Sequence, residues 1–293
     1  MAAVAEELRT VAADLSQGVG EAFPYAVGFF VMFGFFLLTA PAKRLGLDDP
    51  TQHYWASSAT STVHALIVVP LAYYAMEPFW WSEVLTLKTE ASSRVNNIFV
   101  GYIMADTLPL LWNRNRWSGT TVYIWHHGTA FLCWCLMGVR GHGHAIAVGL
   151  ILCEATAPFV NGRWFLSILK MKDGPIYYAN GAAMAVSFFA LRIVWMGWLI
   201  VRNLIMLRSE FFALPVSTIA LVFFGVVVGY PMQMMWFQKI ASGLIKVLRG
   251  SSGKSTKDSP AKAKPKASDA AAKPVRAEAF PVGEANGNDK KVR

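Results

Sequence analysis

The strongest constraint on this chain is a series of apolar segments, each close to the length that crosses a bilayer. A transmembrane helix needs about 20 predominantly apolar residues. Helices satisfy their own backbone hydrogen bonds in hydrocarbon, and the short alternating segments of a β-barrel are not seen. The sequence therefore predicts an all-α integral membrane protein, a bundle of about seven transmembrane helices. The predicted spans are Phe23–Ala40, Trp55–Ala75, Val95–Trp112, Gly119–Val139, Ala145–Val160, Tyr177–Val201 and Leu214–Trp236.

Composition agrees with a membrane location. The 293 residues are 55% hydrophobic and 15% charged, whereas soluble domains carry about 25% charged residues. The net charge is +9, but Lys239–Arg293 alone holds 13 Lys and Arg against 5 Asp and Glu. The basic excess therefore belongs to the C-terminal segment, and we expect no nucleic-acid partner for the helical part.

The chain divides into three predicted parts. Residues 1–20 form a short luminal N-terminal segment without the apolar core of a signal peptide. Residues 21–240 form the transmembrane domain, and residues 241–293 form a basic, disordered tail rich in Ala, Lys, Pro and Ser. The segment Lys239–Arg249 either lies as an amphipathic helix on an anionic lipid surface or simply ends the last span. The sequence leaves both interpretations open.

The tail also predicts orientation and location. Positive residues favour the cytosolic side of a membrane, so we expect a cytosolic C-terminus and, with seven spans, a luminal N-terminus. Lys290 and Lys291, within the last four residues, match the dilysine signal that retrieves membrane proteins to the endoplasmic reticulum. We therefore predict a multi-pass protein of the endoplasmic reticulum membrane.

Two adjacent histidines, His126 and His127, stand inside the fourth predicted span. An ionisable side chain at membrane depth indicates a functional site, and two successive side chains point about 100° apart on a helix. Counted from the cytosolic end, at about 1.5 Å per residue, the pair lies roughly 10–12 Å deep, and Asp106 and Glu154 roughly 9 Å deep. This shared depth predicts a polar chamber in the cytosolic half of the bilayer.

The residues assigned to this chamber have two predicted roles. His64 on its own would also fit a packing histidine, and Asp106 a structural partner of a basic residue. The catalytic candidates are His126, His127, Glu154 and Asp106. The further lipid-binding or chamber residues are His64, Asn161, Thr129, Asn180 and Gln233.

A proline shapes the fifth predicted span beside Glu154. Pro158 cannot donate a hydrogen bond to the carbonyl four residues earlier, which is that of Glu154. We therefore predict a kink and a free carbonyl, with Asn161 on the same face as Glu154. The alternative is an ordinary proline kink followed by a helix-end asparagine.

Other polar residues carry weaker predictions. For Arg192 in the sixth span, packing is favoured over pairing with a carboxylate or snorkelling to the luminal face. His142 and His144 are expected to be solvated in a luminal loop. The cysteines lie inside spans, where neither a disulfide nor a metal site is expected.

Several motifs together resemble the TLC domain family, which includes the TRAM, LAG1 and CLN8 proteins. The resemblance favours the branch of TLC domain-containing protein 4 over the ceramide synthases. The matching pieces run in order through nearly all of the predicted transmembrane part. They are Ser61–Ala65, Gly101–Asp106, His126 and His127, Glu154, and Thr156–Trp164.

The resemblance implies six or seven spans around a lipid-sized cavity, in the endoplasmic reticulum or related membranes. In ceramide synthases the paired histidines support acyl transfer from acyl-CoA to a sphingoid amine, a role that would fall on His126 and His127. The ceramide synthase motif His-Asp-x-x-Asp is replaced here by Cys153-Glu154-x-x-Ala157. Ceramide synthesis is therefore not expected.

Two classes of function stay open. The first is an acyltransferase, with acyl-CoA or a phospholipid as acyl donor and no bound cofactor. The second is a non-catalytic protein that binds or senses a membrane lipid, or serves cargo trafficking. The expected partner in both cases is a membrane lipid or fatty-acyl substrate. A channel is disfavoured because no polar line continues into the luminal half.

Overall fold

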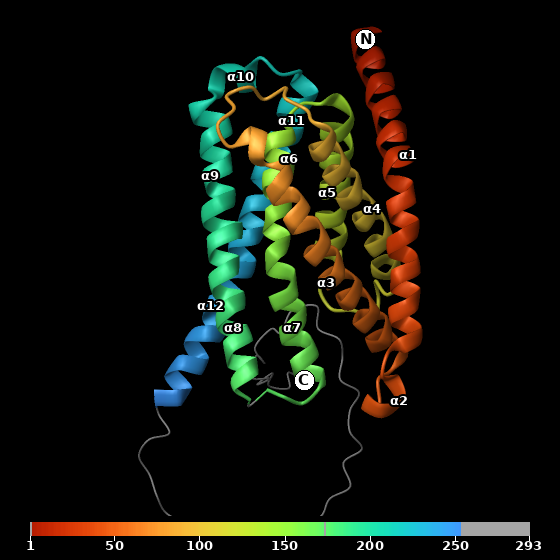
Figure 1. Cartoon of the computed structure of the whole chain (residues 1–293), viewed down its shortest axis with the longest axis vertical. Coiled ribbons are helices and arrows are strands. Elements are labelled where there is room, and N and C mark those ends of the chain that lie inside the picture. The colour runs from red at the N-terminus through yellow and green to blue at the C-terminus, as the bar shows by residue number, and fades with distance from the viewer. Residues whose placement is uncertain (1, 173, 253–293) are drawn as a thin grey trace, which may run out of the picture.

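The computed structural model describes residues 2–172 and 174–252, and every element in this part of the chain is a helix. Figure 1 shows long helices side by side in a bundle, with short ones at its ends. The α-helices are α1 (Ala2–Thr39), α2 (Ala42–Leu45), α3 (Asp49–Ala75), α4 (Glu90–Trp112), α5 (Thr120–Arg140), α6 (His144–Ile151), α7 (Ala157–Ile168), α8 (Pro175–Phe188), α9 (Met196–Val201), α10 (Arg208–Phe212), α11 (Val216–Phe224) and α12 (Tyr230–Ser252).

Short 3₁₀ and π segments interrupt several of these rods. The π segments lie within continuous helical runs and carry residues that line the cavities described below. The 3₁₀ segments are η1 (Glu77–Phe79) and η2 (Leu152–Thr156), and the π segments are η3 (Phe189–Trp195), η4 (Arg202–Met206) and η5 (Gly225–Gly229).

The all-α membrane fold is confirmed, whereas the count of seven spans is not. Within the described residues, five helices are long and apolar enough to cross a membrane: Glu6–Thr39, Asp49–Ala75, His144–Ile168, Pro175–Met206 and Val216–Ile245. The two other predicted spans form α4 and α5, which pack inside the bundle. These two helices carry Asp106 and the histidine pair, and such polar residues lower their mean hydropathy.

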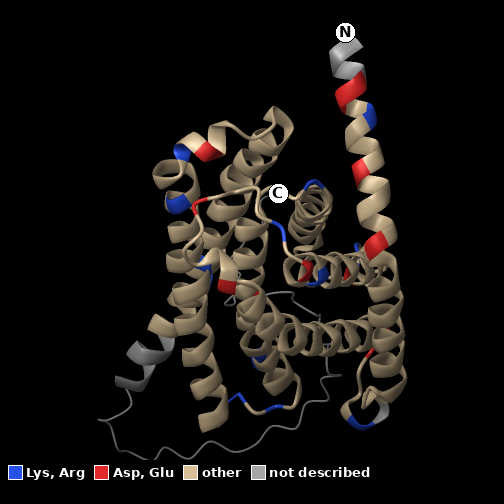
Figure 2. Ribbon diagram, turned by 45° about the horizontal axis from the view of Figure 1, so that its top comes forward, with Lys and Arg blue, Asp and Glu red and all other residues tan. Residues whose placement is uncertain are grey.

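The ends of the chain differ from the predicted boundaries. The first predicted span is the second half of α1, because this helix begins at Ala2 and continues through Pro24. The acidic residues of α1 lie along its N-terminal half (Figure 2). At the other end, Lys239–Arg249 continues α12 as one helix. Residues 253–293, with Lys290 and Lys291, lie outside the described residues.

The close contact between α1 and α4 depends on Gly101 of α4. A Cβ atom at this position would lie 2.6 Å from Cβ of Tyr25 and 2.8 Å from the carbonyl oxygen of Ala22. Both distances are shorter than van der Waals contact, and the backbone of α1 cannot move aside without losing its packing. Gly101 therefore sets how near the two helices can approach.

We expect Gly101→Ala to destabilise the protein by about 1–3 kcal/mol, the usual cost of overpacking a core. The measurement is the thermal unfolding midpoint of purified, detergent-solubilised protein. Gly28→Ala on α1 is the matched control, since no atom lies within 4 Å of a Cβ there. That control should be neutral or slightly stabilising, because alanine favours helix. Equal midpoints for both variants would contradict the close contact.

Candidate functional site

Two cavities meet inside the bundle. The polar cavity lies among α3, α4, α5, η2, α7 and η3 and has a volume of about 170 Å³. The apolar cavity lies among α5, α6, α9, α11 and η5. Phe99, His126, Glu154 and Arg192 line both cavities. We call these four residues, which border both cavities, the junction.

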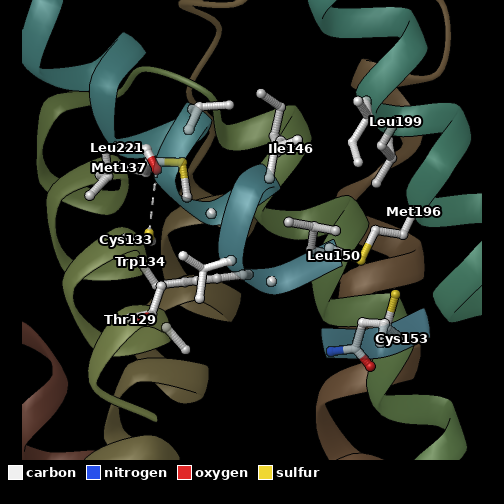
Figure 3. A pocket seen from close by; sticks show the side chains of 18 of the residues that line it. Thr129, Cys133, Trp134, Met137, Ile146, Leu150, Cys153, Met196, Leu199 and Leu221 are labelled. Atoms are coloured by element: carbon white, nitrogen blue, oxygen red, sulfur yellow. Dashed lines mark hydrogen bonds between the residues drawn. The ribbon is translucent and has the colours of Figure 1, made fainter. Parts of the chain in front are cut away.

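Most residues that line the apolar cavity are aliphatic or sulfur-containing, and its polar lining residues are His126, Thr129, Glu154, Arg192, Asn203 and Gln233. Figure 3 shows Cys133 and Met137 of α5 on one side and Met196 and Leu199 of α9 on the other. The thiol of Cys133 donates to the carbonyl of Leu221 at 3.9 Å, so it is engaged with the wall. Such a surface offers few groups for a polar ligand and suits a hydrocarbon chain.

His127 has a polar neighbour at each of its ring nitrogens. Nε2 lies 3.7 Å from Oδ2 of Asp106, and Nδ1 lies 3.3 Å from Oγ1 of Thr107. The hydroxyl of Thr107 donates to the carbonyl of Ile103 at 2.6 Å, so it can only accept from Nδ1. Ser57 donates to the other oxygen of Asp106 at 2.6 Å. His127 is thus an oriented imidazole beside a positioned carboxylate.

His126 has a different environment from its neighbour. Its ring packs edge-on against Trp236, with centroids 5.4 Å apart, and lies 5.9 Å from the ring of His127. No hydrogen bond to His126 is found within residues 2–172 and 174–252. Since this side chain belongs to the junction, its ring nitrogens are available to a molecule that occupies the cavities.

Arg192 binds the second carboxylate of the site. Its Nη2 donates to Oε1 of Glu154 at 3.1 Å, its Nε to the hydroxyl of Thr156 at 2.8 Å, and its Nη1 to the amide oxygen of Gln233 at 3.3 Å. The favoured sequence interpretation of Arg192 as a packing residue is therefore wrong. The rule that singled out the histidines, an ionisable group at membrane depth, would have identified Arg192 as well.

The fifth predicted span leaves α-helical geometry just before Pro158, but the predicted free carbonyl is absent. Residues Leu152–Thr156 adopt a 3₁₀ turn, in which the backbone N–H of Ala157 donates to the carbonyl of Glu154. The tighter turn replaces the bond that Pro158 cannot make. Asn161 lines the polar cavity with Glu154, as predicted, and donates to the hydroxyl of Thr62 at 3.1 Å.

The other predicted chamber residues divide into two groups. Thr129 and Gln233 line the apolar cavity. His64 and Asn180 line neither of these two cavities, so the predicted chamber included them wrongly. His64 is fully buried and stacks on Tyr102 with ring centroids 3.8 Å apart. Asn180 donates to the carbonyl of Phe159 at 2.8 Å and joins α8 to α7.

The expectation that His144 is solvated is also wrong. This residue begins α6 and is fully buried. Its Nδ1 lies 2.8 Å from the hydroxyl of Ser92, and its Nε2 lies 3.3 Å from the carbonyl of Gly138. The helix that it begins packs against both α3 and α4, which enclose this histidine.

Comparison with known proteins assigns this architecture to a family. The family model described as TLC domain matches residues 54–242. TLC domain-containing protein 4-B of Danio rerio is 32% identical over 209 residues, 67% of this chain and 75% of the relative. Human TLC domain-containing protein 4 is 27% identical over 236 residues, 75% of this chain and 84% of the relative. No solved structure matches the chain.

Proposed function

Because this chain belongs to the TLC domain family, we propose that it is a multi-pass membrane protein of lipid homeostasis that handles a fatty-acyl lipid, by acyl transfer. The hydrocarbon chain occupies the apolar cavity, and the polar end of the lipid occupies the polar cavity. One observation carries the proposal. His126 lines both cavities beside the Asp106–His127 pair and has no hydrogen bond within the described residues.

The shape of the site suits a long, two-part ligand. Along α5 the apolar cavity is lined from His126 to Met137, about 16 Å at the helical rise of 1.5 Å per residue. Its polar neighbour begins at the same histidine and holds Asp106 and Asn161. An acyl chain in the first cavity would therefore place its carbonyl carbon at the junction.

The proposed chemistry uses His126 as general base and then as general acid. Its imidazole takes the proton from an acceptor hydroxyl or amine while that group attacks the acyl carbonyl. The new ester or amide bond forms, the bond to the donor breaks, and His126 returns the proton to the leaving group. The carboxylate of Asp106, which lies beside His127, offsets the positive charge that develops during proton transfer. The acyl donor is acyl-CoA or a phospholipid.

The test uses the full-length protein in liposomes with an isotope-labelled acyl-CoA or a labelled phospholipid. Labelled lipid products are identified by mass spectrometry, and binding of the donor is measured in parallel. Acyl transfer that depends on the protein supports the proposal. Saturable binding of acyl lipids without any product, across several donors and acceptors, would overturn acyl transfer and leave a lipid-binding or lipid-sensing protein.

We further propose that the protein resides in the endoplasmic reticulum with its basic tail in the cytosol. The match of the last four residues to a dilysine signal supports this location. Lys290→Ser/Lys291→Ser in the full chain should move the protein to later compartments, as seen by microscopy and glycosidase-resistant processing of an attached reporter. Lys262→Ser/Lys264→Ser, which removes equal charge from the same tail, should leave the location unchanged. An unmoved dilysine variant would contradict retrieval.

A further inference from the structure

We propose that a groove between α1 and the end of α4 binds an anionic glycerophospholipid, with its phosphate group on Arg114 and its acyl chains on the apolar wall. The groove has a volume of about 890 Å³. None of its lining residues lines the polar or the apolar cavity. This lipid site is therefore separate from the proposed function and can be tested without it.

The wall of the groove is made of large apolar side chains that remain uncovered. Trp112 is 74% exposed, Leu108 52% and Phe30 49%. Phe33 of α1 and Leu111 of α4 extend this surface. In a protein that crosses a membrane, such a wall is covered by lipid chains. Its hollow shape would hold one lipid in a defined position.

The rim of the groove is polar and basic. Arg116 donates to Asp49 at 2.8 Å, so these two charges compensate each other. His53 lies 3.9 Å from Asp49 and contacts Asn113 at 3.1 Å. The exposed guanidinium of Arg114 has no ion pair or hydrogen bond within residues 2–172 and 174–252. One uncompensated positive charge thus faces the groove.

The distance between wall and rim fits a phospholipid. Leu108 stands four positions before Trp112, about 6 Å at the helical rise, and Arg114 lies in the turn that follows the end of α4. Trp112 lies between them, and tryptophan is enriched where hydrocarbon meets head groups. An arginine just beyond this level extends its charged end into the head-group region. A zwitterionic lipid would bring its own positive group to Arg114, so the uncompensated charge favours an anionic head group.

The experiment measures lipid retained by the full-length protein, purified from nanodiscs that contain phosphatidylcholine and phosphatidylglycerol in equal amounts. Native mass spectrometry counts the bound lipids of each kind. Wild-type protein should retain phosphatidylglycerol preferentially. Arg114→Gln should reduce this preference about fivefold, the contribution of one basic residue near an anionic surface. Arg114→Lys keeps the positive charge and should therefore retain most of the preference for phosphatidylglycerol.

Arg44→Gln is the matched control. Arg44 is an exposed arginine of α2 that does not line the groove. Its loss changes the net charge equally and should leave the lipid preference unaltered. Equal retention of the two lipids by wild-type protein would overturn the proposal. The proposal would also be overturned if the preference for phosphatidylglycerol were unchanged in Arg114→Gln, or if Arg44→Gln lowered it as much as Arg114→Gln does.

Discussion

Replacing His126 with glutamine should lower the rate of acyl transfer by about 10²- to 10⁴-fold, the usual contribution of a general acid–base residue. Glutamine keeps a polar side chain of similar length at the junction, but it cannot take up and release a proton. Because the imidazole makes no hydrogen bond within the described residues, its loss should leave the thermal unfolding midpoint nearly unchanged. The rate is measured in liposomes from the labelled lipid product.

Two further variants separate the roles of the adjacent histidines. Asp106→Asn removes the charge 3.7 Å from His127 but leaves the proposed base in place, so it should lower the rate less than His126→Gln does. His142→Gln, in the loop between α5 and α6, is a control that should keep full activity. If His126→Gln transferred acyl groups at the wild-type rate, the assignment of the base would be wrong. Donor binding retained by an inactive His126→Gln would locate the defect in the chemical step.

Replacing Arg192 with leucine should destabilise the protein by about 3–5 kcal/mol, because it leaves the carboxylate of Glu154 buried without its cation. Both side chains are largely enclosed, with exposures of 13% for Arg192 and 17% for Glu154. The same substitution also removes the donors to Thr156 and Gln233. The measurement is again the unfolding midpoint of purified protein.

The double variant Glu154→Leu/Arg192→Leu distinguishes an unpaired charge from lost packing. An apolar pair of similar volume is often as stable as the ion pair it replaces, so the double variant should recover much of the stability lost in Arg192→Leu. Arg94→Leu is the control, since Arg94 forms a surface pair with Glu90 and should change stability little. A double variant less stable than Arg192→Leu alone would contradict the role of the ion pair.

Much of the site followed from residue type and helical spacing. Depth counting along separate helices placed Asp106 level with His127, and their side chains lie 3.7 Å apart. The seven-residue spacing within one span placed Asn161 on the same helix face as Glu154, and both line the polar cavity. The prediction for Asp106 and His127 succeeded because all spans cross the same bilayer. The position of a residue along its span therefore gives its approximate depth in the membrane.

Other residues show where this reasoning fails. His64 shares the depth of the chamber but stacks on Tyr102 outside it, because depth carries no information about the direction in which a side chain points. Arg192 was assigned to packing, whereas its partners come from η2 and α12. Glu154 was expected beside a free carbonyl, but the 3₁₀ turn satisfies that group locally. The errors for His64 and Glu154 concern the rotation or local geometry of a helix.

By itself, the sequence determined that this protein is a helical membrane bundle and that polar groups gather at one level within it. Burial of apolar segments and the fixed rise of the helix are enough for that conclusion. Only the tertiary structure decided which helix faces meet. It places His127 beside Asp106 and Glu154 beside Arg192, and it places His126 in the lining of both cavities. The rotation of each helix is set by side-chain packing against its neighbours, which no single segment encodes.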